Sequence, residues 1–184
     1  MRQIDQSTAM TIHASLFRAA LGRFCSGVTV ITTSTPDGVH GMTATAFSSL
    51  SLTPPLILVC VANNARMNQA LAGSLRFGVS ILAENQSAIS AFYAGRGARE
   101  NVPDTEALGD AVVLTGAIAQ LECSLASRHE GGDHTIYVGR VEACRVAEGA
   151  PLLYFCGGYR ELREAARQLS ASDLSNDFWL GDQE

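Results

Sequence analysis

The sequence predicts a mainly β fold with short helices, an α+β chain whose strands form a closed antiparallel barrel. Several short runs of apolar and β-branched residues are separated by Gly, Pro, Asn and Asp turn signals. The helical segments between them are small, unlike the long helices that alternate with strands in a doubly wound parallel sheet. At 184 residues the chain is long enough to form one domain with its own apolar core.

The pattern of the first third of the chain predicts a helix and three strands. Apolar residues recur at helical spacing from Leu16 to Phe24, so a short amphipathic helix opens the fold. The run Val28–Thr33 contains only Val, Ile and Thr, a turn signal follows at 35–38, and Val39–Ala46 resumes the extended pattern, which predicts a hairpin. After two prolines, Leu56–Ala62 is wholly apolar, as in a central strand buried on both faces.

The middle of the chain predicts two helices, a strand and a loop. The pair Asn63-Asn64 supplies N-cap chemistry for a helix over Ala65–Ala72. A strand over Phe77–Leu82 and a helix over Ser87–Tyr93 follow. The segment Gly95–Gly109 is polar, contains Gly and Pro and has no period, so we expect a long surface loop of the kind that covers a site.

The last third predicts further strands. Odd positions are apolar over Ala117–Leu125, which indicates a strand with one face in the core and the other in solvent. In the next strand the apolar parity changes at Gly139, which predicts a β-bulge. A last short strand over Pro151–Cys156, a turn at 157–160 and a helix over Glu161–Leu169 complete the prediction.

Composition and charge exclude several classes of partner. The net charge of -5 and the lack of a Lys/Arg cluster argue against nucleic acid, and the apolar runs are too short to cross a membrane. The N-terminus lacks the continuous apolar core of a signal peptide, so we expect a cytoplasmic protein. Five cysteines without C-x-x-C spacing predict buried, reduced thiols: Cys25, Cys60, Cys123, Cys144 and Cys156.

Common nucleotide-binding and hydrolase motifs are missing. The chain contains no G-x-G-x-x-G, P-loop or G-x-S-x-G pattern, so any nucleotide is held in another way. Small and hydroxyl residues dominate Gly41–Ser51, where an accessible backbone could bind the polar edge of a planar heteroaromatic ring. The alternative is an ordinary Ser/Thr-rich edge strand followed by a loop.

Two further segments combine polar groups suited to binding. In Asn63-Asn64-Ala65-Arg66, a helix start and a guanidinium could hold a phosphate, or the segment could be ordinary capping beside an exposed arginine. In Gly132-Asp133-His134-Thr135, the imidazole could point into a cleft with Asp133 fixing its orientation. The alternative is a turn that carries a surface histidine.

Four blocks of the sequence together resemble the flavin reductase family that serves two-component flavin-dependent monooxygenases. They are FRAALGRFCSGVTVITT, GMTATAFSSLSLTPPLILVCV, GGDHTIYVGRV and PLLYFCGGYREL, and they extend from about Phe17 to Leu162. The resemblance implies an FMN-binding split barrel, usually a homodimer, that reduces FMN or FAD with NADH or NADPH and releases the reduced flavin to an oxygenase. It also implies an N-terminal extension at 1–16, a split-barrel domain at 17–169 and a C-terminal tail at 170–184.

The resemblance assigns site residues by position and implies no metal. By this resemblance, residues 40–43, 45 and 46 would line the isoalloxazine ring, Ser48 and Ser49 would lie beside the flavin chain, and residues 60–62 would back it. Arg66 would bind the phosphate. His134, the catalytic candidate, would lie near the nicotinamide. The implied cofactor-binding residues are His40, Gly41, Met42, Thr43, Thr45, Ala46, Ser48, Ser49, Cys60, Val61, Ala62, Arg66 and Tyr159. The chain departs from the family pattern at Asn63, Ala65 and Met67, where relatives often have Lys, Ser or Thr, and at Phe92, where an arginine is common.

Two other functions remain open at this point. One is a flavin-retaining oxidase of the pyridoxamine-phosphate oxidase type, although its phosphate-ester substrates call for more cationic residues than this chain offers. The other is a non-catalytic flavin-binding or metal-binding module that uses His129, Asp133 and His134. Between NADH and NADPH, the lack of a basic cluster for a 2′-phosphate favours NADH.

Overall fold

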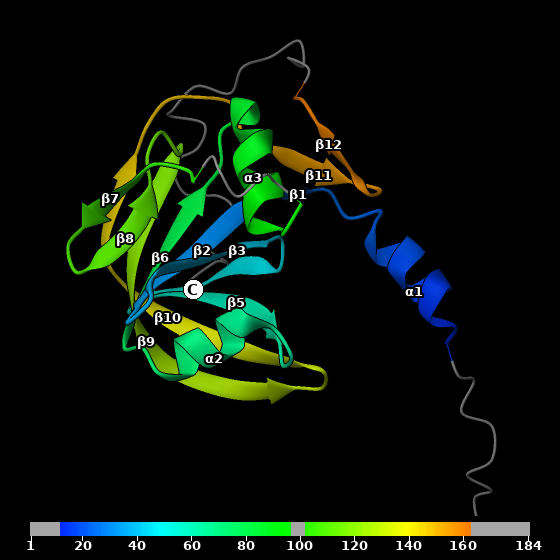
Figure 1. Cartoon of the computed structure of the whole chain (residues 1–184). Helices are drawn as coiled ribbons and strands as arrows, with labels where there is room; N and C mark the ends of the chain where they lie inside the picture. The colour runs from blue at the N-terminus through cyan, green and yellow to red at the C-terminus, as the bar shows by residue number, and fades with distance from the viewer. Residues whose placement is uncertain (1–11, 97–101, 163–184) are drawn as a thin grey trace, which may run out of the picture.

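One antiparallel sheet of seven strands, in the order β3-β2-β6-β9-β10-β5-β4, dominates the structure (Figure 1). The computed structural model describes residues 12–96 and 102–162. The strands of this sheet are β2 (Thr29–Thr35), β3 (Gly38–Ala44), β4 (Phe47–Leu52), β5 (Pro55–Ala62), β6 (Arg76–Ile81), β9 (Ala119–Gly131) and β10 (His134–Val146).

Smaller elements surround the main sheet. Strands β7 and β8 form a two-stranded sheet, strands β1, β11 and β12 form a three-stranded one, and a 3₁₀ turn leads into helix α3. Their bounds are β1 (Ser26–Gly27), β7 (Thr105–Leu108), β8 (Ala111–Leu114), β11 (Leu153–Phe155), β12 (Gly158–Arg160), α1 (Ala14–Leu21), α2 (Arg66–Ala72), η1 (Glu84–Gln86) and α3 (Ser87–Tyr93). The predicted fold class, mainly β with short helices, is confirmed.

The sheet is open rather than closed. Strands β3 and β4 each have one hydrogen-bonded neighbour in the main sheet, and within the described residues no ladder joins them. Strand β3 lies near β5 on the curled sheet, as the two ribbons in Figure 1 show. The arrangement is therefore that of a split barrel, and the prediction of a closed barrel was wrong because both sheet edges stay unpaired.

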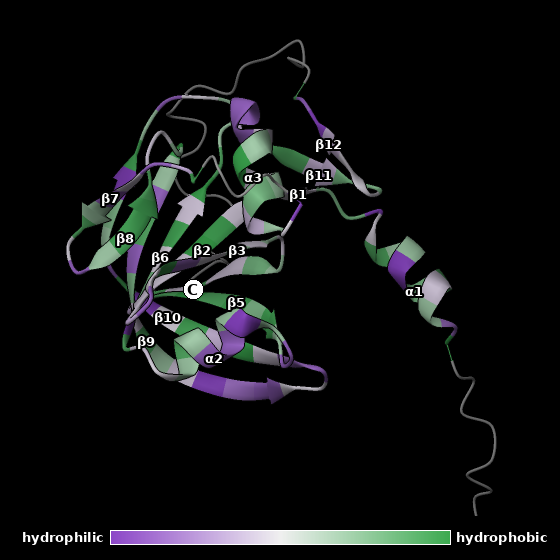
Figure 2. Cartoon of the chain, viewed as in Figure 1, coloured by the Kyte–Doolittle hydropathy of each residue, from purple (hydrophilic) through white to green (hydrophobic). Residues whose placement is uncertain are grey.

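The apolar core occupies both faces of β2. Ile31 and Val79 belong to a cluster with the inner residues of β5 and with Met67 and Leu71 of α2. Val30 points to the other face and packs in a second cluster. The strand predicted to be buried on both faces, Leu56–Ala62, buries only alternate residues fully, because one face of β5 packs in the core cluster and the other is only partly covered. Figure 2 shows β5 as almost uniformly hydrophobic and the distal part of β9 as hydrophilic.

The polar face predicted for the strand over Ala117–Leu125 is covered rather than solvated. Gln120 and Glu122 are 3% and 5% exposed, since the β7–β8 hairpin packs over them. Glu122 Oε1 accepts hydrogen bonds from Arg76 Nη1 at 2.9 Å and from the Asp110 backbone at 3.0 Å. Strand β7 also corrects the prediction of an unstructured loop over Gly95–Gly109, of which residues 97–101 lie outside the described residues.

A β-bulge lies beside Gly139 as predicted, but its additional residue, Ala126, belongs to the partner strand β9, and the additional residue of β10 is Glu142. The register between β9 and β10 shifts between Val138 and Gly139. A Cβ atom at Gly139 would lie 2.5 Å from Phe77 Cζ, so the bulge brings the backbone against the core at a position that only glycine fits.

The N-terminal helix forms where it was predicted but does not pack on the domain. Helix α1 projects away from the sheet (Figure 1), and none of its residues is buried. Its large apolar side chains include Leu16, Phe17 and Leu21, which are 67%, 52% and 57% exposed. Among residues 12–96 and 102–162, nothing covers the apolar face of this amphipathic helix.

Three other predictions need correction or fall partly outside the described residues. All five cysteines have free thiols, but only Cys123 is buried, and Cys25, Cys144 and Cys156 are exposed because their segments lie at the periphery. Glu161 and Leu162 are not helical, and the rest of the helix predicted to end at Leu169 lies outside the described residues. In the described part of the chain, no helix is long and apolar enough to cross a membrane.

Candidate functional site

The small-residue segment 41–51 connects the two open edges of the main sheet. It runs from β3 through a short turn into β4. Alternate residues of an edge strand direct their backbone N–H and C=O groups away from the neighbouring strand. The two interpretations of this segment are therefore compatible, because an edge strand is also where a ring could meet unpaired backbone groups.

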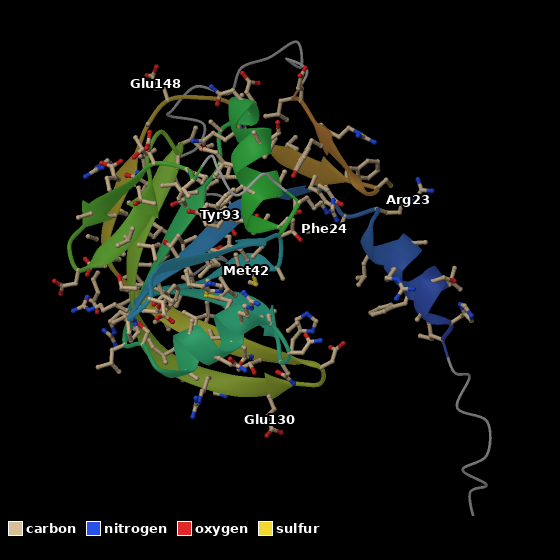
Figure 3. All side chains as sticks on the ribbon, in the orientation of Figure 1. Arg23, Phe24, Met42, Tyr93, Glu130 and Glu148 are labelled. Atoms are coloured by element: carbon tan, nitrogen blue, oxygen red, sulfur yellow. The ribbon has the colours of Figure 1, made fainter. Side chains whose placement is uncertain are left out.

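Strand alternation places the predicted residues of β3 on two faces. Gly41 lies under Tyr93 of α3, and a Cβ atom there would be 2.3 Å from Tyr93 Cε1. Thr43 faces the same helix, whereas Met42 packs against the core cluster on the opposite face. In Figure 3, Tyr93 and Met42 lie on opposite sides of β3. The side chains of His40–Thr43 thus cannot all contact one ring, although the backbone between them can.

Thr43, Thr45 and Tyr159 meet on the α3 side of the strand. They line a pocket of about 190 Å³ that Ser90 and Arg96 complete. Thr43 Oγ1 donates to the Ser90 carbonyl at 2.7 Å, and the Tyr159 hydroxyl donates to Ser90 Oγ at 2.9 Å. Ser90 is buried, and through these two hydrogen bonds it links β3, α3 and β12 at this pocket.

His40 and Arg66 meet on the α2 side. Both line an open pocket of about 590 Å³ between the β2–β3 turn and α2, together with Asp37 and Gln69. Burial, and in addition the positive charge of Arg66, hold the pKa of His40 below its ordinary value. The lowered pKa favours the neutral His40 ring, so the Arg66 guanidinium is the cationic group of the pair that would favour an anion such as a phosphate.

The remaining predicted flavin contacts lie on β4, β5 and the turn before β4. Ala46, Ser48 and Ser49 are exposed, and Ala46 accepts a backbone hydrogen bond from Cys60 at 3.0 Å. Val61 is buried in the core cluster, so it cannot back a flavin with its side chain. Its neighbours on β5, the half-buried Cys60 and Ala62, point to the other face.

His134 begins β10, immediately after the turn from β9. Its Nδ1 donates to Asp133 Oδ1 at 2.7 Å, so the structure contains the orienting hydrogen bond that the sequence suggested. This hydrogen bond and the charge of His134 lower the pKa of Asp133. The His134 side chain is 43% exposed, and His134 pairs with Ala62 in the β5–β10 ladder.

The metal-binding alternative finds no assembled ligand set. Within residues 12–96 and 102–162, no three His, Cys, Asp or Glu side chains gather as a metal site would require. His129 Nε2 instead contacts Ser127 Oγ at 2.9 Å, and His129 pairs with Ile136 in the ladder, away from His134.

The capping predicted for Asn63-Asn64 was wrong. Ala65 occupies the N-cap position of α2, and no side chain caps this helix. The Asn63 side chain binds the β9–β10 turn instead, donating from Nδ2 to the Gly132 carbonyl at 3.1 Å. A more distant partner in the fold thus replaces the local one expected from sequence.

Three residues of the site were missed by sequence reasoning. Ser90 and Tyr93 belong to a helix that was predicted correctly, but its contact with β3 depends on the fold. Arg96 follows that helix and lines the Thr43 pocket. Phe92, which replaces the arginine common in the family, packs edge-to-face on Tyr93. The sequence feature that could have indicated this contact is Arg96, a cation about one helical turn beyond Phe92.

Comparison with known proteins extends over most of the chain. A family described as "Flavin reductase like domain" matches residues 21–163. An NADH-dependent flavin reductase from a Rhodococcus species is 40% identical over 153 residues, which cover 82% of this chain and 87% of that protein. The reductase component of 4-hydroxyphenylacetate 3-monooxygenase from Thermus thermophilus is 46% identical, covering 79% of this chain and 95% of that protein. Among solved structures, flavin reductase PheA2 superimposes with a TM-score of 0.81 at 39% identity, covering 83% of this chain and 100% of that one.

The shared pocket of His40 and Arg66 yields a testable prediction. Replacing Arg66 with Gln removes one of the two causes that lower the pKa of His40, so this pKa should rise part of the way to its ordinary value. NMR titration of the His40 ring protons measures the change. Arg128→Gln, on the β9–β10 hairpin and outside the His40 pocket, is the matched control and should leave the titration unchanged. An unaltered His40 titration in the Arg66 variant would contradict the arrangement.

Proposed function

This chain belongs to the flavin reductase like domain family, and we propose that it is an NADH-dependent flavin reductase that supplies reduced FMN or FAD to a partner monooxygenase. We assign this activity to a domain of residues 17–169. The observation that carries the proposal is the alignment, along most of both chains, with a relative named NADH-dependent flavin reductase. The oxygenase partner is proposed because another relative is named a monooxygenase reductase component.

The residues at the open edge of the sheet fit a flavin. Thr45, Ala46, Ser48 and Ser49 are exposed and small, so a planar ring could approach the backbone closely. Unpaired backbone groups of β3 and β4 offer donors and acceptors for the polar edge of the ring. We assign the flavin phosphate to Arg66 of α2, which shares its pocket with His40 of the edge strand β3.

The chain contributes mainly position and orientation. When bound, the flavin accepts at N5 the hydride that NADH gives up from C4, so NADH becomes NAD⁺ and the flavin gains two electrons. The protein must hold these two atoms about 3 to 3.5 Å apart. Asp133 engages Nδ1 of His134 and leaves Nε2 as the ring nitrogen that can meet the nicotinamide.

A weak hold on the flavin suits its release as a product. In this assignment the ring is bound mainly through backbone groups, and Arg66 is the principal cation at the phosphate. Such contacts give orientation with few charge-assisted hydrogen bonds. Reduced flavin could then leave for the oxygenase component without a large energetic barrier.

Steady-state kinetics with added flavin tests the proposed function. NADH oxidation should be slow without free flavin and should increase strongly and saturably when FMN or FAD is added; comparing the two identifies the preferred flavin. A flavin-retaining oxidase would turn over without added flavin, and a non-catalytic module would not oxidise NADH at all. Either result would overturn the proposal.

His134 should matter for nicotinamide binding more than for flavin binding. In His134→Ala, we expect the KM for NADH to rise about tenfold, as the loss of one ligand hydrogen bond would cause. The KM for flavin should change little. His129→Ala, on the same hairpin, is the control and should behave like the parent. Equal kinetics of His134→Ala and the parent with both substrates would remove His134 from the site.

We also propose that the protein is a homodimer in which the apolar face of α1 packs on a second copy. The support is the projection of α1 from the domain, with Leu16, Phe17 and Leu21 exposed. Burying such side chains in an interface removes apolar area from water.

Charged substitutions on α1 should separate the subunits. Phe17→Glu combined with Leu21→Glu places two charges on the apolar face, so sedimentation should change from twice the 19.5 kDa chain mass to a single chain. Arg18→Gln, on the same helix, should leave the dimer intact. A parent protein that sediments as a monomer, or a double variant that stays dimeric, would contradict this role of α1.

A further inference from the structure

Asn63 makes three hydrogen bonds to the turn that carries His134. Its backbone N–H donates to the Asp133 carbonyl at 2.9 Å, and its side-chain Nδ2 donates to the Gly132 carbonyl at 3.1 Å. Its Oδ1 accepts from Thr135 Oγ1 at 2.8 Å. Asn63, the first residue after β5, thus contacts Gly132 and Asp133 before His134 and Thr135 after it, and Asp133 in turn orients the imidazole.

The Asn63 contacts continue into the interior of the domain. Thr135 Oγ1 accepts from Asn68 Nδ2 at 3.0 Å, and the Tyr137 hydroxyl donates to Asn68 Oδ1 at 3.1 Å. Tyr137 is 1% exposed, and Asn68 lies on α2. Along this series of hydrogen bonds each donor meets an acceptor, which is consistent with the orientation of the Asn63 and Asn68 side-chain amides.

The turn joins β9 to β10, and its side chains add little packing to the hairpin pairing. Gly132 has φ +74°, and no atom lies within 4 Å of the position that a Cβ atom would take there. The Asp133 side chain is 93% exposed, so packing does not hold it. The β9–β10 ladder closes the turn at the Gly131–His134 pair, and the β5–β10 ladder ends at the Ala62–His134 pair. Asn63, directly after Ala62, adds the hydrogen bonds that tie this turn to the end of β5.

We propose that Asn63 is a positioning residue that holds the Gly132-Asp133 turn, and through it the His134 imidazole, in the geometry that receives the nicotinamide. This role rests on the proposed function, because it acts through the nicotinamide contact of His134. Asn63 itself need not touch NADH or flavin. Its effect should therefore disappear when the imidazole is absent.

A double-mutant cycle tests this dependence. In Asn63→Ala, we expect the KM for NADH to rise about fivefold, the order expected for losing side-chain hydrogen bonds, with kcat and the flavin KM within about twofold of the parent. In the His134→Ala background, the same substitution should add no further increase. Asn64→Ala, at the next position, is the matched control and should resemble the parent.

A conservative variant refines the test. Asn63→Asp keeps an acceptor for Thr135 but loses the donor to the Gly132 carbonyl, so its KM for NADH should lie between those of the parent and Asn63→Ala. Thermal melting of each variant verifies the fold. An unchanged KM in Asn63→Ala, or an increase equally large in the His134→Ala background, would overturn the proposal.

A measurement independent of activity separates this proposal from the proposed function. The Asp133 carboxyl has a lowered pKa because it accepts the His134 hydrogen bond, so a loosened turn should raise this pKa toward its ordinary value. Carboxyl NMR titration should show the rise in Asn63→Ala and not in Asn64→Ala. A parent without NADH-dependent flavin reduction would overturn the proposed function, whereas an unchanged Asp133 titration in Asn63→Ala would overturn the positioning role.

Discussion

The antiparallel ladder between β5 and β10 is the constraint on which the candidate site depends. Its register places His134 opposite Ala62, at the point where β5 ends. Asn63 therefore meets the β9–β10 turn, and α2 begins close to the same end of the ladder. A shift of one residue would reverse the faces of all these side chains, so the apolar residues of β5 that are buried in the core also determine where the imidazole lies.

The two open edges of the sheet form the other half of the site. Because no strand in the described part of the chain pairs with the outer sides of β3 and β4 in the main sheet, the small residues between and along them are accessible. Exposed edges invite association with other chains, and a bound planar ligand is one way to use them. The side chains of β3 alternate between α3 and α2, so two different pockets border the same strand.

Sequence reasoning succeeded where the signal lay within a few consecutive residues. The register shift beside Gly139 followed from a change of parity, and the orienting contact of Asp133 with His134 followed from adjacency. It failed where the partner was distant. Asn63 next to a helix indicated capping, but its actual partner, Gly132, lies 69 residues further along the chain. Gln120 and Glu122 were predicted to face solvent, because no feature of the neighbouring sequence indicates that the β7–β8 hairpin covers them.

The sequence by itself determined the class of fold and the family, because strand periodicity, turn residues and four separated blocks are readable along the chain. Only the tertiary structure decided that the sheet stays open, that Ser90, Tyr93 and Arg96 border the predicted strand, and that α1 exposes its apolar face. The physical reason is that local propensity defines each element, whereas pairing order, register and packing depend on contacts between residues far apart in the chain.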